Sequence, residues 1–353
     1  MVSPPRVIKF TSAMKNFVLS SGLLLAAVAY GQPKCDRACL DGFVDKYLEA
    51  MVAHDPKLVP FAKGVTFTEN GQKLEIGDGL WNTMAGRGTY RLFVTDPEAG
   101  SVAFIGTIRE DARDPAMPAP AVMALRLKVV NRQITEVETL VCRNEGATRA
   151  ATNLEKMGAP HPLFSKEIPA GQRMSRADLV KTANMYFSGM EKNDGRGNYP
   201  FADDCDRIEM GSHTTNAPVP AGQTKPDPAT ATNYSATWSC MEQFKSGLLH
   251  FVYRIRDRRY VAVDRERGLV FTFAFFDHPG GKTRNFETPT GRKVTAGPTT
   301  PWTWEIAEMF RIENGKLRQI EAIMDRSPYG MNSGWSNYAQ GSSSAARDVT
   351  GVK

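Results

Sequence analysis

The sequence predicts an α+β fold in which two tandem domains of one kind pack together as an intrachain pseudo-dimer. The first observation is a repeated segment, because "PFAKGVTFTENG" at residues 60–71 returns as "PFADDCDRIEMG" at residues 200–211. The second is that each copy follows apolar residues at helical spacing and precedes apolar, strand-like runs. A lone sheet has one apolar face to cover, and a duplicated chain supplies a partner of its own kind.

Each copy is predicted to begin with an amphipathic helix. In the first copy, apolar residues recur at helical spacing from Leu40 to Val52. In the second copy, the same spacing runs from Leu179 to Met190, and "SRAD" at residues 175–178 resembles a capping box.

Apolar strands and a hairpin complete each copy. "DPEAGSVAFIGTIRE" at 96–110 matches "DRERGLVFTFAFFDH" at 264–278, a turn followed by a strand. The segments 125–143 and 309–326 each predict two strands around a tight turn, and the second contains the favoured hairpin dipeptide Asn-Gly. Each helix is therefore followed by roughly four strands of a curved antiparallel sheet.

The repeat sets the domain boundaries. Copy one spans 35–146 and copy two spans 175–330, with a linker at 147–174 between them. Copy two contains an extra loop at 212–240, rich in Pro, Thr and Ala, which is either a lid or a tolerated surface insertion. Residues 331–353 are predicted to be a flexible tail.

The composition is that of a globular protein, with 41% hydrophobic and 23% charged residues among 353. The net charge of +6 is modest, and the Arg-rich stretch 253–268 also contains acidic residues, so it predicts a solvated strand face and no nucleic-acid partner. The sequence contains no phosphate-binding loop, nucleophile elbow or dinucleotide fingerprint, so neither a cofactor nor a covalent intermediate is expected. No metal site is expected, because "CDRAC" at residues 35–39 lacks a matching second pair.

The N-terminus predicts entry into the secretory pathway, with the protein secreted or lumenal. Residues 1–31 have the pattern of a signal peptide, and Met14 offers an alternative start. After its removal no membrane span is expected, because no later stretch approaches 18 uninterrupted apolar residues. Asn233 lies in an N-glycosylation sequon, which fits that compartment.

Five cysteines are compatible with an oxidising compartment. Cys205 and Cys240 lie in the second copy and are expected to form a disulfide. Cys142 is expected to pair with Cys35 or Cys39, which leaves one cysteine over.

The order helix, "PFA" link, strand ending in a carboxylate and Gly, then long strands resembles the nuclear-transport-factor-two-like superfamily. Ketosteroid isomerase, scytalone dehydratase and SnoaL-type polyketide cyclases belong to it. The whole arrangement is similar to duplicated SnoaL-like proteins that fungi export or use in secondary metabolism. This resemblance covers nearly all of residues 35–330 and implies two cone-shaped domains.

The same resemblance implies roles for three residues of the second copy. Tyr186 matches the phenolic donor of the isomerases, Glu209 their general base, and Glu308 in "EMFRI" their protonated carboxylic acid. In the first copy Tyr47 and Glu69 match the first two positions, and Met123 is expected at the third.

The residues around Glu308 support that role independently. In "WTWEIAEMFRI" at 302–312, Glu308 shares a strand face with apolar residues, and burial favours its neutral form. A neutral acid can donate a hydrogen bond to a developing oxyanion. The alternative is that Glu308 pairs with Arg311 or Arg254.

Other candidates are aromatic residues and histidines. An apolar ligand is expected to contact aromatic side chains, unless these form ordinary core or the contact between the copies. His250 and His278 are weaker catalytic candidates, and the paired Glu138 and Glu321 are expected to face solvent. The aromatic candidates are Phe271, Phe273, Phe275, Trp302 and Trp304.

Together these features predict a cofactor-independent lyase, isomerase or cyclase acting on an apolar, oxygenated natural product. The reaction would be dehydration, enolisation, or a guided cyclisation or cycloaddition. The alternatives are a secreted small-molecule-binding protein without chemistry and a structural or surface-interaction protein. A homo-oligomer is compatible with the sequence.

Overall fold

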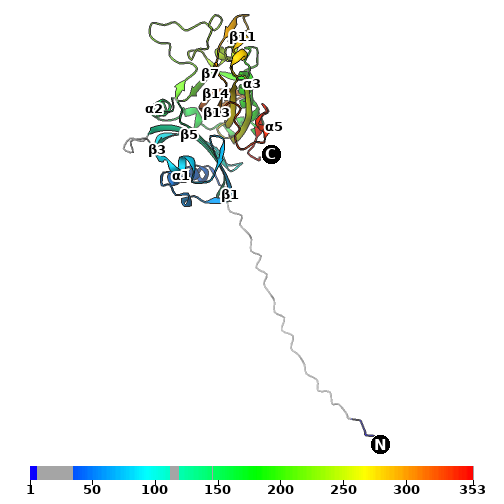
Figure 1. The fold of residues 1–353 in the computed structure, drawn as a ribbon. Helices are drawn as coiled ribbons and strands as arrows, with labels where there is room; N and C mark the ends of the chain where they lie inside the picture. The colour runs from blue at the N-terminus through cyan, green and yellow to red at the C-terminus, as the bar shows by residue number, and fades with distance from the viewer. Residues whose placement is uncertain (6–34, 112–118, 145, 353) are drawn as a thin grey trace. The chain divides into compact units, whose positions relative to one another are not determined.

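Two large, curved and mostly antiparallel sheets with few helices make up the fold (Figure 1). The computed structural model describes residues 1–5, 35–111, 119–144 and 146–352. The chain divides into Met1–Pro33 and the unit Lys34–Lys353, and only the second contains described helices and strands. Apart from residues 1–5, the predicted signal peptide lies outside the described residues.

The first repeat is a helix followed by a six-stranded sheet. Its elements are α1 (Arg37–Val52), η1 (Pro56–Leu58), β1 (Phe61–Glu69), β2 (Gln72–Leu74), η2 (Gly79–Asn82), β3 (Met84–Asp96), β4 (Ser101–Glu110), β5 (Ala119–Val130) and β6 (Gln133–Cys142).

The second repeat builds a seven-stranded sheet and carries a separate two-stranded hairpin. The connection holds α2 (Ala147–Met157), η3 (Pro162–Phe164) and η4 (Ala170–Gln172). The repeat itself contains α3 (Arg176–Met190), β7 (Phe201–Glu209), β8 (Ser212–His213), α4 (Cys240–Lys245), β9 (Arg254–Asp264), β10 (Leu269–His278), η5 (Gly281–Arg284), β11 (Asn285–Glu287), β12 (Lys293–Thr295), β13 (Trp302–Glu313) and β14 (Lys316–Ser327), followed by α5 (Tyr338–Gly341) and β15 (Arg347–Asp348).

The strand order confirms the duplication. The first sheet runs β2-β1-β6-β5-β4-β3, and the second runs β8-β7-β14-β13-β10-β9 with β15 added at the β9 edge. In both sheets the first long strand pairs in parallel with the last, β1 with β6 and β7 with β14. The two repeats therefore share one topology.

Capping residues fix where the two long helices begin. The Asp36 side chain accepts a hydrogen bond from the Cys39 N–H, and the Ser175 side chain accepts one from the Asp178 N–H. Such caps satisfy backbone donors that have no partner inside the helix. The Ser175 half of the expected capping box is therefore present, and no return bond from the Asp178 side chain to the Ser175 N–H is among the described contacts.

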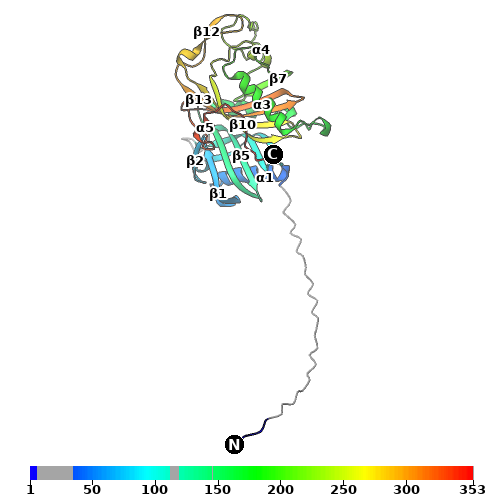
Figure 2. The same ribbon diagram turned by 90° about the vertical axis from the view of Figure 1, so that its right-hand side faces the viewer.

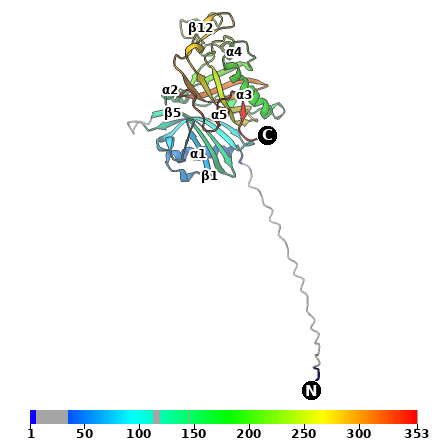
Figure 3. The ribbon, with the colours of Figure 1, turned by 45° about the vertical axis from the view of Figure 1, so that its right-hand side comes forward.

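Each long helix covers one face of its own sheet, and the two opposite faces pack against each other. Figures 2 and 3 show the blue-to-cyan first repeat and the green-to-orange second repeat as layers in contact. We call the layer between the sheets the seam. Its buried apolar side chains include Tyr90, Leu92, Ala103, Ile105, Leu140, Val261, Leu269, Phe271, Phe273 and Met309.

Two ion pairs cross between the repeats at equivalent places. Arg37, the first residue of α1, pairs with Asp264 of the second repeat at 2.7 Å. Arg176, the first residue of α3, pairs with Asp96 of the first repeat. Reciprocal contacts of this kind are typical of a two-fold, isologous interface, which supports the predicted pseudo-dimer.

Glu138 and Glu321 are buried in the seam, so the expectation that they face solvent is wrong. Glu138 of the first repeat pairs with Arg259 of the second at 2.6 Å. Glu321 of the second repeat accepts a hydrogen bond from the Tyr90 hydroxyl of the first at 2.7 Å. The strand faces that carry Glu138 and Glu321 would be exposed to solvent in an isolated repeat, but each is covered by the other repeat.

The linker and the tail are more structured than the sequence predicted. The segment 147–174 begins with the helix α2, which contributes Ala150 and Leu154 to the seam. Residues 331–352, which we call the strap, are not a loose tail, because β15 pairs with β9 and Arg347 pairs with Asp257.

The strap also contacts the first repeat. Trp335 Nε1 donates a hydrogen bond to Thr68 Oγ1 at 2.8 Å, and the Arg126 guanidinium lies 4.7 Å from the centre of the Trp335 ring. Lys128 Nζ donates to the Thr350 carbonyl at 2.7 Å. The strap therefore connects both sheets.

Cys205 and Cys240 form the predicted disulfide, but the other predicted pair is wrong. Cys35 bonds to Cys39, and Cys142 is a buried free thiol. Cys142 faces the seam, whereas Cys35 packs on the helix side of the same sheet. Side chains on opposite faces of a sheet cannot meet.

The two disulfides fit an oxidising compartment, in agreement with secretion. Within the described ranges, no helix combines the length and apolarity needed to cross a bilayer.

Candidate active site

The structure brings together the three residues predicted for catalysis. Glu308 on β13 pairs across to Ala322 on β14, and Ala322 pairs across to Glu209 on β7. The two acids thus flank Ala322 in one row of the sheet, with roughly 10 Å between their Cα atoms. Tyr186 of α3 packs onto this face beside Phe310.

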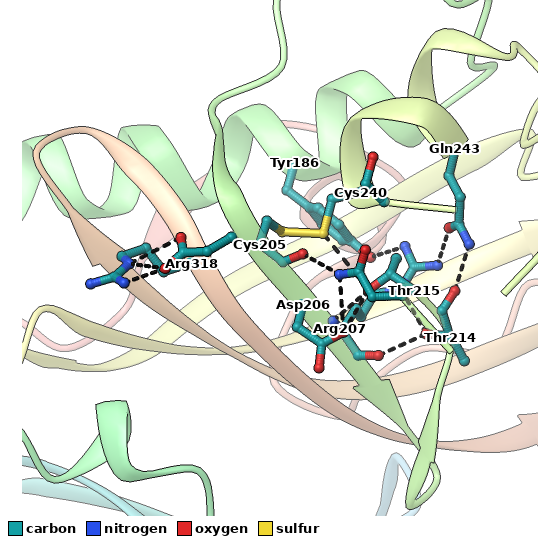
Figure 4. Close-up of a disulfide and its surroundings, with 12 residues drawn as sticks. Tyr186, Cys205, Asp206, Arg207, Thr214, Thr215, Cys240, Gln243 and Arg318 are labelled. Carbon is teal, nitrogen blue, oxygen red and sulfur yellow. Dashed lines mark hydrogen bonds and ion pairs between the residues drawn. A yellow bond between two sulfur atoms is a disulfide. The ribbon is translucent and has the colours of Figure 1, made fainter. Parts of the chain in front are cut away.

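Arg207 connects Tyr186 with Gln243 and Thr214 (Figure 4), and the sequence analysis missed it. Its guanidinium donates hydrogen bonds to the Tyr186 hydroxyl at 3.1 Å and to Gln243 Oε1 at 2.6 Å. It also donates to Thr214 Oγ1 at 2.9 Å and lies 3.5 Å from Glu209 Oε1.

We call Tyr186, Arg207, Glu209 and Glu308 the Arg207 cluster. The signal for Arg207 was present in "CDRIE", because residues two apart on a strand share a face. The basic residue at position 207 therefore has to lie beside Glu209 on the same face of β7.

Glu308 is a buried acid whose environment favours the protonated form. It is 1% exposed, and its Oε2 has no hydrogen-bond partner among the described residues. Burial raises the pKa of Glu308 well above its usual range, the nearby Glu209 raises it further, and Arg207 opposes the shift. The expected ion pair with Arg311 or Arg254 is absent from the described contacts, where Arg311 pairs with Glu313 and Arg254 with Asp277.

Tyr186 and Arg207 add a hydrogen-bond donor and a positive charge. Burial raises the pKa of Tyr186 well above 10, so its hydroxyl stays protonated. Burial alone would lower the pKa of Arg207, but Glu209 and Tyr186 outweigh it and raise the pKa. The cluster therefore combines a neutral acid, a phenol and a cation with Glu209, whose side chain is 25% exposed.

A cavity of about 480 Å³ lies further along β13 and β14, and no member of the Arg207 cluster is among its described lining residues. Its wall includes Met324, which pairs with Ile306, the next position along the face from the Glu308–Ala322 pair. Two residues along a strand correspond to about 7 Å. The cavity is lined by Asn144, Met210, Trp302, Trp304, Met324, Asp325 and Arg326.

The predicted aromatic ligand contacts divide between two places. Trp302 and Trp304 line the cavity. Phe271 and Phe273 instead lie in the seam, and Phe275 is buried on their strand face with Arg256 over its ring. Side chains alternate along β10, so these three phenylalanines point away from Glu308. Their prediction as substrate contacts is wrong.

Neither histidine joins the Arg207 cluster. His278 is fully buried and stacks on Trp302, with ring centres 4.1 Å apart. Burial lowers the pKa of His278 to about 4, so its ring is neutral. His250 stacks on Phe286 and contacts the Asn193 carbonyl through Nδ1 at 3.3 Å, and burial lowers its pKa.

The corresponding residues of the first repeat hold its own structure together. Glu69 accepts hydrogen bonds from the Leu80 N–H and from Arg143, both at 2.8 Å. Gly79 has a φ of +63°, and a Cβ there would lie 2.5 Å from Glu69 Oε2, so the turn needs glycine. The Tyr47 hydroxyl accepts a hydrogen bond from Trp81 Nε1 at 3.1 Å.

The register also corrects the third position of that set. In the second repeat, Ala322 lies between Glu308 and Glu209 in one row of paired residues. In the first repeat, Thr139 lies in the same way between Leu125 and Glu69. Leu125, and not Met123, therefore occupies the place of Glu308. The first repeat places Phe67 where the second has Arg207.

Comparisons with known proteins give a family but no activity. A family model described as "Domain of unknown function (DUF8021)" matches residues 34–141 and 172–324, which correspond to the two repeats. No curated protein matches the chain. Among solved structures, a de novo designed protein with a curved β-sheet is 16% identical, with a TM-score of 0.23 over 43% of this chain and 88% of the designed one. This likeness carries no argument about function.

Proposed function

The chain belongs to the DUF8021 family, whose description names no activity, so from its own side chains we propose that the second repeat catalyses proton transfer on an apolar, oxygenated small molecule. The reaction class is a cofactor-independent lyase, isomerase or cyclase step. Enolisation and dehydration are the simplest members of this class. The resemblance of the Tyr186, Glu209 and Glu308 segments to ketosteroid isomerase supports the same proposal.

The observation that carries the proposal is the buried carboxyl of Glu308, whose Oε2 has no hydrogen-bond partner among the described residues. A buried acid with an unpartnered oxygen destabilises a fold, so its presence calls for another explanation. Perturbed acids of this kind are typical of active sites. In the first repeat, Leu125 fills the same position without this cost.

The proposed roles follow from charge and exposure. Glu209, the most exposed member, accepts a proton from the substrate. Glu308 and Tyr186 donate hydrogen bonds to the oxygen on which negative charge develops, and Arg207 stabilises that charge from beside Tyr186. Trp302 and Trp304 contact the apolar part of the substrate in the cavity.

A second candidate is a secreted binding protein with the same cavity and no chemistry. It is favoured by the position of Trp304, which lies four residues along β13 from Glu308, or about 13 Å. A ligand held only by the tryptophans would not reach the acids.

One experiment separates the two functions. The gene is deleted in the host, and the purified protein is added to the mutant extract, which is then analysed by mass spectrometry. We expect an accumulated compound to be converted, with loss of water indicating a dehydratase and equal mass an isomerase or cyclase. A compound that co-purifies without conversion supports the binding protein.

Variants then test the assigned roles. Glu209→Gln and Glu308→Gln are expected to reduce conversion about 100-fold or more, the usual effect of losing an acid–base group. Glu287→Gln, at an exposed position of β11, is the control and should convert at the wild-type rate. Full activity in both cluster variants would refute the proposal.

A further inference from the structure

The cavity at the end of β13 and β14 contains hydrogen-bond donors that the fold does not use. It lies beyond the last pair between β14 and β7, Ala322 with Glu209, where no described strand pairs with that side of β14. Asn144 of the first repeat borders the cavity and donates through Nδ2 to the Arg326 carbonyl at 3.1 Å. Both repeats therefore contribute to its walls.

The two tryptophans of this cavity differ from the other three in the chain. Trp81, Trp238 and Trp335 each donate through Nε1 to a described acceptor, at 2.7–3.1 Å. Trp302 and Trp304 have no such acceptor among the described residues, and neither of their nitrogens is buried. Because an indole N–H usually finds a partner in a folded protein, these two donors are available to a ligand.

Arg326 adds a guanidinium with the same property. Its central carbon lies 5.0 Å from the centre of the Trp302 ring, and Trp304 is its cross-strand partner on β13. Stacking on a ring occupies the face of a guanidinium and leaves the N–H groups at its edge free. This guanidinium has no ion pair or hydrogen bond among the described residues, so its charge is available to an anion.

The three donor side chains share one face of the sheet. Trp302 and Trp304 are two residues apart on β13, and Arg326 pairs with Trp304. Asp325 is the one acid among the described lining residues, and alternation along β14 places its side chain on the opposite face. There its Oδ1 accepts a hydrogen bond from Asn144 Nδ2 at 2.7 Å. The donor side of the cavity therefore has a positive charge without a matching negative one.

A guanidinium and two indole N–H groups beside an apolar space fit a carboxylate. Arg binds a carboxylate through two parallel hydrogen bonds, and charge-assisted bonds are roughly twice as strong as neutral ones. The lining also includes the apolar side chains of Met210 and Met324, and a volume of about 480 Å³ is typical of a small-molecule site. One guanidinium matches the single charge of a carboxylate.

We propose that this cavity binds the carboxylate of a small apolar acid, with Arg326 as its ionic partner and the indole N–H groups of Trp302 and Trp304 as further donors. The apolar body of the acid contacts the methionines and the indole rings. This binding does not depend on proton transfer, because no member of the Arg207 cluster is among the described lining residues. That the acid is also the substrate rests on the proposed function.

Calorimetric titration of the full-length protein tests this with a matched pair of probes, 4-phenylbutanoate and its neutral amide, 4-phenylbutanamide. We expect the carboxylate to bind roughly tenfold more tightly, because only the carboxylate forms charge-assisted hydrogen bonds. Arg326→Met, which keeps an apolar side chain beside Trp302, should reduce this preference to about twofold or less. Trp304→Phe, which keeps a ring but loses the N–H, should weaken carboxylate binding about threefold and amide binding less.

Arg196→Met is the control for the change in net charge. Arg196 is exposed in the loop after α3 and has no described ion pair, so both affinities should stay at their wild-type values. Thermal unfolding verifies that each variant is folded. Equal affinity for the two probes, no measurable binding of 4-phenylbutanoate, an unchanged preference in Arg326→Met, or the same loss in Arg196→Met would overturn the inference.

The Glu308→Gln variant separates this inference from the proposed function. Its preference for 4-phenylbutanoate should equal that of the wild type, because Glu308 is not among the described lining residues of the cavity. If this variant also converts the natural compound at the wild-type rate, the catalytic role of Glu308 fails while the carboxylate site stands. If the variant loses conversion but the wild type does not distinguish the two probes, the proposed function stands and the carboxylate site fails.

Discussion

The two repeats share one topology but differ in the chemistry of one small region. In the first repeat, Phe67 and Leu125 occupy the positions that Arg207 and Glu308 occupy in the second. Glu69 is satisfied by Leu80 and Arg143, whereas the one described side-chain contact of Glu209 is with Arg207 at 3.5 Å, and Glu209 is partly exposed.

This difference shows what a duplication permits. One copy can convert its polar positions to apolar packing and serve as a stable support. The other can keep buried charges that cost stability, which is the usual condition of a functional site. Four sets of variants test this difference between the repeats.

The largest effect is expected when the first repeat receives the acid of the second. Leu125→Glu buries a carboxyl where Phe67 stands in place of Arg207, so no cation offsets it, and this should lower the free energy of unfolding by about 5 kcal/mol. Urea denaturation measures this loss. Leu125→Met, which keeps the volume, should cost less than about 1.5 kcal/mol; equal losses would mean that packing alone explains the position.

The two disulfides should differ in their contributions. Cys205–Cys240 closes a separation of 35 residues and Cys35–Cys39 one of 4. Chain entropy then predicts losses of about 4 and about 2 kcal/mol when each pair is changed to serine. Chemical denaturation of the two double variants measures both losses in free energy of unfolding. A larger loss for Cys35–Cys39 than for Cys205–Cys240 would contradict the chain-entropy prediction.

Glu138 and Glu321 share a position in the repeats but should titrate differently. Glu138→Gln leaves the buried Arg259 with only its 3.4 Å contact to Asp257 among the described ion pairs and should cost about 3 kcal/mol at neutral pH. Burial raises the pKa of Glu321 from 4.5 to about 7 in the folded protein. The protonated Glu321 therefore contributes its full share to the free energy of unfolding below pH 4.5, and this share is lost as the pH rises through 7.

Glu321→Gln removes that dependence. The free energy of unfolding of Glu321→Gln minus that of the wild type should therefore rise by about 2–3 kcal/mol between pH 5 and pH 8. Unfolding curves at several pH values provide the measurement. A constant difference would mean that Glu321 is ionised in the seam throughout this range.

The smallest effect on stability is expected for the reverse exchange in the second repeat. Glu308→Leu replaces a buried acid, whose Oε2 has no described partner, by the residue found in the first repeat and should stabilise the protein by about 1 kcal/mol. Thermal unfolding tests this, and conversion of the natural compound should be lost in the same variant. A marked destabilisation would make Glu308 a structural residue.

Local patterns were sufficient for the repeat, the two long helices and the shared face of Glu308 with its apolar neighbours. Helical spacing, the cap at Ser175 and the Asn314-Gly315 turn are all properties of adjacent residues. The disulfide of Cys205 was also predictable, because both its cysteines lie in the second repeat.

The predictions that were wrong concern residues whose surroundings are set by contacts between the two repeats. Glu138 and Phe271 face the seam, and no property of their own strands shows that a second sheet covers them. Cys142 faces the same layer, which removed it from the predicted pairing. Trp335 lies in a polar segment, and its partners Thr68 and Arg126 are more than 200 residues away in the chain.

The strap has a consequence for how this protein is made. A ribosome adds about 5–20 residues each second, so the first sheet is complete roughly 10–40 s before residues 331–352 emerge. During that interval the apolar seam face of the first repeat has no covering sheet. The final fold, with Trp335 against Thr68 and Arg347 against Asp257, can close only after residues 331–352 have been synthesised. We therefore expect a chain truncated before the strap to depend on chaperones for much longer than the full-length protein does.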